Sequence, residues 1–218
     1  MTRAVFFDSK VKTWMEMFNL AQTYCASDKK DVPEILDIVE NSAKQGLYVA
    51  GFVSYEAASS FDQSLKHQEL HDTPLAWFAE FRAIRPFELS ENDDAIDLYP
   101  VTEDENFISS VMRIRDFLES GEVYQVNLTQ KLHGDPGNSA TNIFSKLVRT
   151  QPSPYAMLLE SDDFSICSAS PELFFSKRGR MIEMQPMKGT RERGRFNEED
   201  KKNKEDLKEF PTYEYGKY

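Results

Sequence analysis

Two apolar runs joined by a short basic turn constrain the fold of this chain more than any other feature. Residues 173–176 and 181–185 are separated by Lys-Arg-Gly-Arg, and such a glycine-containing break between short apolar runs is typical of a β-hairpin. Hairpins join antiparallel strands, and the chain shows no regular alternation of strand, helix and strand. We therefore predict an α+β fold, with antiparallel sheets and packed helices, rather than a doubly wound parallel sheet.

Periodic apolar positions predict several helices. The segment 33–44 is expected to be helical because its apolar residues cluster on one side and Gly46 follows where a helix commonly ends. A second helix begins near Thr102, which with Glu105 has the spacing of a capping box, and ends at Gly121. Two more helices are predicted, over 141–149 and over the charged segment 197–209.

Other segments predict strands. Residues 47–54 are almost continuously apolar, which predicts a strand buried on both faces, with Gly51 marking a bulge. Residues 123–129 alternate apolar and polar, which predicts a strand with one polar face. Further strands are expected near the N-terminus and over 155–160 and 164–169. The acidic break at 91–94 predicts a boundary between a region 1–95 and a second region 96–209, followed by a tail 210–218.

Composition and charge narrow the class of function. The net charge is −11 over 218 residues, and 40% of the residues are hydrophobic, so the chain can bury a core but lacks the basic balance of a nucleic-acid or anionic-membrane binder. No apolar run approaches the roughly 18 residues of a membrane span, and no signal peptide opens the chain. We expect a cytoplasmic protein that handles small molecules, with Cys25 and Cys167 as buried, reduced thiols.

One lysine and one glutamate are the candidates for chemistry. Lys188 lies sixteen residues after Glu172, and the predicted hairpin between them would return the chain toward Glu172. A lysine desolvated beside a carboxylate can act as a nucleophile or general base, although such a pair is also common as a surface ion pair. The basic residues Lys188, Arg191, Arg193 and Arg195 could hold an anionic substrate, or could form a solvated turn that balances nearby glutamates.

Three ordered sequence blocks carry a family resemblance. They are Gly-Glu-Val-Tyr-Gln-Val-Asn-Leu-Thr at 121–129, Ser-Ala-Ser-Pro-Glu-Leu-Phe at 168–174, and Gln-Pro-Met-Lys-Gly-Thr-Arg at 185–191. In order and spacing they resemble the chorismate-utilising enzymes, and residues 51–58 resemble the N-terminal region of the same family. The resemblance extends from about residue 30 to Glu209. It implies an α+β fold that is an incomplete half of the family's sandwich.

The resemblance also implies an activity. A lysine at position 188 resembles the aminodeoxychorismate synthase component I branch of the family, which aminates chorismate with ammonia from a glutamine amidotransferase partner on the folate route. By that resemblance Lys188 attacks chorismate, Glu172 is the general acid and base, and Gly189 and Thr190 bind a substrate carboxylate. Tyr124 and Asn127 match a motif near an effector or structural pocket.

The resemblance implies a Mg²⁺ cofactor whose ligands belong to family segments after the Glu209 region. No similarity is recognisable over 210–218, so the metal ligands are expected outside this chain. Two alternatives stay open beside amination. The chain could be a non-catalytic fragment that binds only a partner or effector, or it could be similar to anthranilate synthase component I. Open sheet edges and apolar surface would favour self-association in either case.

Overall fold

A computed structural model describes residues 1–66, 73–91, 96–135, 137, 139–186 and 192–209. The chain divides into two compact units, Met1–Ala169 and Ser170–Tyr218, and each is described by itself. The predicted tail 210–218 and the predicted active-site residues 187–191 lie outside the described residues. The predicted division near residue 95 stays a prediction.

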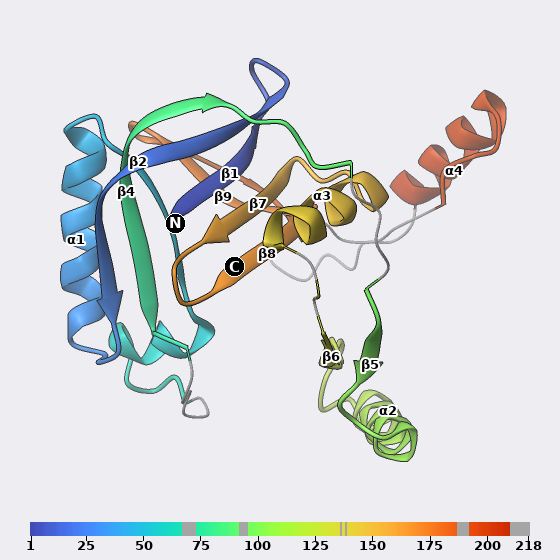
Figure 1. Ribbon diagram of the computed structural model, residues 1–218. Helices are drawn as coiled ribbons and strands as arrows, with labels where there is room; N and C mark the ends of the chain where they lie inside the picture. The colour runs from blue at the N-terminus through green and yellow to red at the C-terminus, as the bar shows by residue number, and fades with distance from the viewer. Residues whose placement is uncertain (67–72, 92–95, 136, 138, 187–191, 210–218) are drawn as a thin grey trace. The chain divides into compact units, whose positions relative to one another are not determined.

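An antiparallel sheet of six strands forms most of the first unit (Figure 1). Its strand order is β3-β4-β2-β1-β7-β8, so strands from the beginning and the end of the unit meet at the β1–β7 pair. This arrangement confirms the prediction of an α+β fold with antiparallel pairing. The strands are β1 (Arg3–Asp8), β2 (Thr13–Ala26), β3 (Tyr48–Val53), β4 (Ala76–Pro86), β7 (Tyr155–Glu160) and β8 (Ser165–Ser170).

The sheet curls, because strands at its two ends share one core. Ala50 and Phe52 of β3 pack in the same apolar cluster as Ile166 of β8, although four strands lie between β3 and β8 in the strand order. The rings of Phe52 and Phe164 meet edge to face with centroids 5.8 Å apart. Curling lets an open sheet bury its concave face on itself, which removes apolar surface from water. Fully buried members of this cluster include Ala4, Ala79, Phe81 and Leu159.

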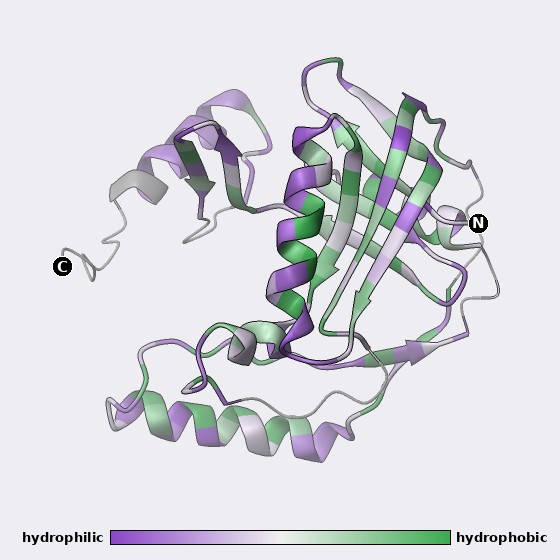
Figure 2. Cartoon of the chain, turned by 90° about the vertical axis from the view of Figure 1, so that its left-hand side faces the viewer, coloured by the Kyte–Doolittle hydropathy of each residue, from purple (hydrophilic) through white to green (hydrophobic). Residues whose placement is uncertain are grey.

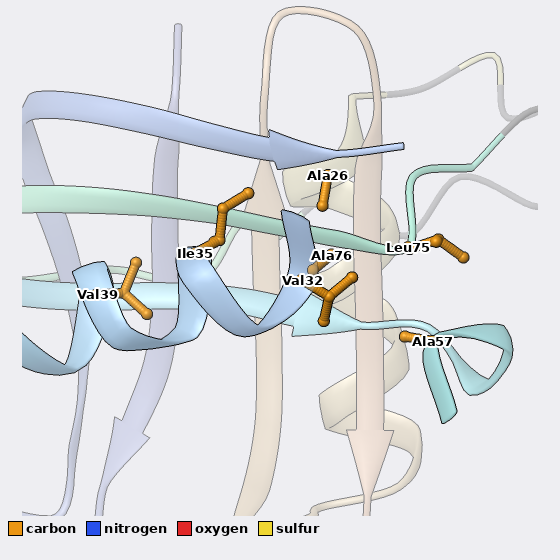
Figure 3. Close-up of a cluster of buried hydrophobic side chains, with 7 residues drawn as sticks. All are labelled: Ala26, Val32, Ile35, Val39, Ala57, Leu75 and Ala76. Atoms are coloured by element: carbon orange, nitrogen blue, oxygen red, sulfur yellow. The ribbon is translucent and has the colours of Figure 1, made fainter. Parts of the chain in front are cut away.

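Helix α1 (Asp31–Lys44) covers the outer face of the sheet at the β3–β4–β2 end. Its buried residues Val32, Ile35 and Val39 recur at helical spacing and face Ala26 and Ala76 of the sheet (Figure 3). The helix ends before Gly46, which has a φ of +93°. The predicted helix and its end are therefore confirmed, and the short 3₁₀ helix η1 (Tyr55–Ser60) contributes Ala57 to the same cluster.

Helix α3 (Ala140–Thr150) covers the same outer face at the β1–β7 end. Its N-terminus is capped by Ser139, whose hydroxyl accepts a hydrogen bond from the Asn142 N–H at 3.3 Å. Phe144 and Val148 are buried against Val5 and Leu158. The predicted helix over 141–149 and the predicted strands over 155–160 and 164–169 are confirmed.

The strand predicted over 47–54 exists as β3, but its predicted burial is wrong. β3 is an edge strand, and the side chains of Tyr48 and Val53 are 38% and 43% exposed. No bulge occurs at Gly51 either, because its pairing with Phe78 continues an unbroken register. The glycine is needed for a different reason: a Cβ at this position would lie 2.2 Å from the Trp77 carbonyl oxygen.

Helix α2 (Asp104–Glu119) and a short ladder form a further part of the first unit. The helix ends near Gly121 as predicted, with a φ of +75° at that glycine. The predicted capping box is wrong, because the N-cap is Glu103 and no side chain caps the helix. The strand predicted over 123–129 is also wrong: this segment is irregular, and only β5 (Leu98–Pro100) and β6 (Leu132–Gly134) pair nearby in sequence.

The second unit contains the predicted hairpin and the predicted charged helix. The hairpin strands are β9 (Leu173–Arg178) and β10 (Met181–Gln185), and the helix is α4 (Asn197–Glu209). Gly179 has a φ of +60°, so it supplies the left-handed residue that the tight turn requires. The register runs from Met181 opposite Arg178 to Gln185 opposite Leu173, with an irregularity between Glu183 and Gln185.

Candidate active site

Glu172 lies at the open end of the hairpin, immediately before β9. Its backbone is held by Ser170: the Glu172 N–H donates to the Ser170 hydroxyl at 3.3 Å, and that hydroxyl donates to the Glu172 carbonyl at 3.0 Å. Such serine turns fix a chain reversal without a strand. The Glu172 side chain is exposed. The local structure therefore presents this carboxylate to solvent at the end of a defined turn.

The hairpin brings the chain back to the end that carries Glu172. Gln185, the last residue of β10, pairs with Leu173, the residue that follows Glu172. Lys188 comes three residues after Gln185 in the sequence, and Lys188, Gly189 and Thr190 lie outside the described residues. The predicted meeting of Lys188 with Glu172, and the roles of Gly189 and Thr190 in substrate binding, stay predictions.

Two arginines of the predicted basic turn have carboxylate partners. Arg193 donates from Nε and Nη2 to the two oxygens of Asp200, at 2.7 and 2.9 Å. Arg195 forms a similar pair with Glu199, with the closest side-chain contact at 3.1 Å. Both carboxylates lie in the first turn of α4. For these two arginines, the arrangement favours the prediction of a basic turn balanced by acidic neighbours over the prediction of an anion-binding site.

These ion pairs lower the pKa values of two carboxyl groups in α4. The hydrogen bond from the Arg193 side chain, and next the N–H of Gly194 at 2.9 Å, hold the pKa of Asp200 below its usual value. The Arg195 side chain likewise lowers the pKa of Glu199. The sequence predicted a basic turn balanced by nearby glutamates but did not identify the individual partners. Arg195 and Glu199 are four residues apart, and Arg195 precedes the first residue of α4.

Tyr124 and Asn127, predicted near an effector or structural pocket, lie in the irregular segment after α2. The Tyr124 side chain is 90% exposed, and Asn127 accepts a hydrogen bond from the Gln125 side chain at 3.1 Å. A β-strand forms only where a neighbouring strand takes up its N–H and C=O groups. In the part of the chain that the structure describes, no strand pairs with this segment, and the role of the two residues stays a prediction.

The Mg²⁺ expected from the family resemblance does not fit the residues described. Mg²⁺ in proteins is held by carboxylates and other oxygen ligands in octahedral geometry. Across 1–66, 73–91, 96–135, 139–186 and 192–209, no three His, Cys, Asp or Glu side chains are grouped so that they could hold a metal ion.

The hairpin and α2 share an unusual exposure of apolar side chains. α2 has no buried residue, although Figure 2 shows apolar and polar residues interleaved along it. On the hairpin, both faces expose large apolar side chains. Surfaces of this kind usually mark a contact with another protein surface. The most exposed of these side chains are Ile108, Met112, Phe174, Phe175, Met181, Ile182 and Met184.

Comparison with known proteins gives this arrangement a context. Residues 83–211 match a family model described as chorismate binding enzyme. Aminodeoxychorismate synthase component 1 of Bacillus subtilis (strain 168) is 36% identical over 139 residues, which cover 64% of this chain and 29% of that protein. Anthranilate synthase component 1 of Acetivibrio thermocellus is 28% identical over 162 residues, which cover 74% of this chain and 32% of that protein.

A third relative, anthranilate synthase component 1 of Lactococcus lactis subsp. lactis (strain IL1403), is 30% identical over 179 residues and is covered to 38% of its length. The chain thus spans about a third of the length of the curated relatives that it matches. Among the described helices, none combines the length and the apolar character that a bilayer span requires.

Proposed function

This chain belongs to the family of chorismate binding enzymes, and on that premise we propose that it carries the lysine and glutamate segment of an aminodeoxychorismate synthase component I. The observation that supports the proposal is the β9–β10 hairpin, which begins directly after Glu172 and ends three residues before Lys188. In the proposed reaction, chorismate and ammonia give 4-amino-4-deoxychorismate and water.

The two side chains would divide this reaction between them. The neutral amine of Lys188 attacks the chorismate ring while Glu172 protonates the C4 hydroxyl, which leaves as water. Ammonia then adds at C4, the bond to the lysine Nζ breaks, and Glu172 takes up the surplus proton. A covalent intermediate of this kind splits one difficult displacement into two easier ones. The backbone N–H groups and hydroxyl of Gly189 and Thr190 would hold a substrate carboxylate.

The partners and cofactor belong to the same proposal. Ammonia would come from a glutamine amidotransferase subunit, the reaction would take place in the cytoplasm, and Mg²⁺ would require ligands beyond the residues described. Within this proposal the 218-residue chain alone does not turn over chorismate. This proposed inactivity is supported by the exposure of Glu172 and of the apolar side chains of the hairpin and α2. Efficient catalysis requires a preorganised site from which water is excluded.

Anthranilate synthesis is the second candidate function. Anthranilate synthase component 1 from both Acetivibrio thermocellus and Lactococcus lactis is similar to this chain, whereas Lys188 supports amination at C4. A third reading, a fragment that binds only a partner or effector, is consistent with the exposed apolar faces. The products separate the two enzymatic candidates, because anthranilate and 4-amino-4-deoxychorismate differ in mass and in absorbance.

The test grafts residues 83–209 in place of the matching segment of the Bacillus subtilis relative. The graft, the 218-residue chain and a Lys188→Ala graft are incubated with chorismate, Mg²⁺ and ammonium, and products are followed by mass spectrometry. We expect 4-amino-4-deoxychorismate from the graft only, and none from its Lys188→Ala variant. Lys177→Ala, an exposed lysine of the same hairpin, is the matched control and keeps activity.

Each result has a consequence. Turnover by the 218-residue chain itself would overturn its proposed inactivity. Product from the Lys188→Ala graft would remove lysine from the mechanism, and anthranilate as the product would establish the second candidate. Circular dichroism of each graft, matched to the parent relative, ensures that a loss of product reports chemistry rather than misfolding.

Self-association is proposed as a further property of the 218-residue chain. The edge strand β3 has the sequence Tyr-Val-Ala-Gly-Phe-Val, with no charge and no proline to block pairing with another strand. The apolar faces of α2 and the hairpin add to this tendency. Sedimentation velocity should show dimers or larger species at micromolar concentration, and a Val53→Lys change at the exposed end of β3 should reduce them. A monodisperse monomer would contradict the proposal.

A further inference from the structure

The first unit contains a cavity of about 710 Å³ between the turn that leads into α1 and the region after η1. This volume falls within the range of pockets that take small molecules. Neither Glu172 nor the predicted pocket residues Tyr124 and Asn127 line it. The lining residues are Asp28, Lys29, Lys30, Ser59, Ser60, Gln63, Leu65 and Lys66.

The charge of this cavity opposes that of the chain. Three lysines and one aspartate line it, so it carries a net charge of about +2 by formal charges, in a chain with a net charge of −11. Lys30 pairs with Asp28 at 3.5 Å. Within the described residues, no ion pair joins Lys29 or Lys66 to a carboxylate. Two ammonium groups are therefore left to attract an anion.

The ionised form of Asp28, the aspartate that lines the cavity, is stabilised by its neighbours. The backbone N–H of Lys30 donates to Asp28 at 3.0 Å, and the side chains of Lys30 and Lys29 add positive charge nearby. Together they hold the pKa of Asp28 below its usual value. The surroundings of this turn thus stabilise a carboxylate that the chain supplies, and the same groups would stabilise a carboxylate or phosphate supplied by a ligand.

Neutral donors line the same space. The Ser60 hydroxyl, in the cavity wall, is buried and has no hydrogen-bond partner among the described residues. An unpaired buried hydroxyl is unfavourable, and because the Ser60 oxygen is shielded from solvent, a ligand acceptor would reach it only after a rotation of its side chain. The Gln63 side chain adds amide donors. Ammonium, hydroxyl and amide donors around one cavity form a set that suits an oxygen-rich anion.

We propose that this cavity binds a small organic dianion at a site separate from the residues proposed for catalysis. Dicarboxylates and phosphate esters are the two sources of that chemistry, because each presents two negative charges on oxygen atoms, a dicarboxylate on two separate carboxylates and a phosphate ester on one phosphate group. The lysines are exposed, so their contribution is moderated by solvent, and we expect a Kd on the order of 1 mM. Chorismate chemistry is not required for this binding.

The test follows the backbone amides of the ¹⁵N-labelled chain while inorganic phosphate or succinate is added at constant ionic strength, with acetate as a monoanion reference. We expect saturable shifts confined to residues 28–30 and 59–66. Changing Lys29→Gln together with Lys66→Gln should weaken binding by at least about tenfold. The matched control changes the exposed lysines Lys10→Gln and Lys131→Gln and should leave binding unchanged.

Both arms of the titration are informative. Saturation by phosphate alone, by succinate alone or by both would support the site and identify the phosphate ester, the dicarboxylate or either as its ligand. Shifts that spread over the surface, follow ionic strength, or survive the double lysine change would overturn the proposal. Because the readout is binding to the first unit, it is independent of whether the graft aminates chorismate.

Discussion

Glu16 offers the sharpest test of how the first unit is held together. Its side chain is 3% exposed and accepts from two arginines: Arg3 Nη1 at 3.2 Å and Arg85 Nε at 2.6 Å. Arg3 also binds Glu160 at 2.5 Å and donates to Thr141 of α3 at 2.6 Å. This single carboxylate therefore connects β1, β2 and β4 and, through Arg3, β7 and α3. Replacing Glu16 by Gln removes the charge and keeps the shape.

The size of the loss follows from the exposure of each partner. A hydrogen bond to a charged group contributes roughly 1.5–3 kcal/mol, and breaking a buried ion pair costs up to about 5 kcal/mol. Arg85 is 51% exposed and can recover water, whereas Arg3 is 23% exposed and keeps Glu160. We therefore expect Glu16→Gln to lower the free energy of unfolding by about 2–4 kcal/mol.

Urea unfolding followed by tryptophan fluorescence measures this change, because the chain has two tryptophans, and Trp14 of β2 and Trp77 of β4 both lie in the apolar clusters of the first unit. With a slope of about 2–3 kcal/mol per molar urea, the midpoint should fall by roughly 1 M. The matched control is Glu40→Gln, which breaks an exposed i,i+4 pair with Lys44 and should cost at most about 0.5 kcal/mol. Equal losses for Glu16→Gln and Glu40→Gln would refute the reasoning.

Three further predictions test local features. Cys25 is exposed, so the prediction of two buried thiols is wrong for that residue. Burial, and next the charge of Glu160, raise the pKa of Cys167 to about 11, so alkylation at pH 8 should label Cys25 first. The free energy of unfolding should fall as pH rises from about 9 toward 11, because only the unfolded Cys167 thiol ionises there, and Cys167→Ala should remove that fall. Gly51→Ala places a Cβ 2.2 Å from the Trp77 carbonyl oxygen and should lower unfolding stability by about 1–3 kcal/mol, as measured in urea. The partners of Asp200 hold the pKa of its carboxyl low, so the carboxylate stabilises α4 at neutral pH and this stabilisation is lost as pH falls through the lowered pKa. Asp200→Asn should therefore reduce helical circular dichroism at pH 7 and flatten the acid transition of α4.

The sequence correctly predicted the elements that are determined by interactions between neighbouring residues. α1, α3 and the β9–β10 hairpin depend on helical periodicity, caps and a glycine turn, all of which lie within a few neighbouring residues. The long strand β2 was not predicted, since its residues pair with β1 and β4, and β4 begins fifty residues after β2 ends. Burial depends on the same distant partners, which is why β3 was predicted in place but wrongly predicted to be central.

The candidate site was predictable to the same extent. The hairpin follows from its own sequence, so the return of the chain toward Glu172 could be predicted, whereas the pairing of Arg193 with Asp200 depends on where α4 begins. The cationic cavity was not found in the sequence, because its lysines come from two segments separated by about thirty residues. Only the packing of η1 near the start of α1 brings those segments together.

The contrast between α2 and α3 separates secondary structure from burial. Both helices have apolar residues at helical spacing, yet α3 buries Phe144 and Val148 and α2 buries nothing. Periodicity therefore forms the helix, and a covering surface decides whether its apolar face leaves water. The alternation over 123–129 is a similar case, since it has the pattern of a strand without a neighbour to pair with. These two segments are accordingly where we expect a second surface to bind, and protection of α2 from hydrogen exchange should rise with chain concentration if that surface is another copy of the chain.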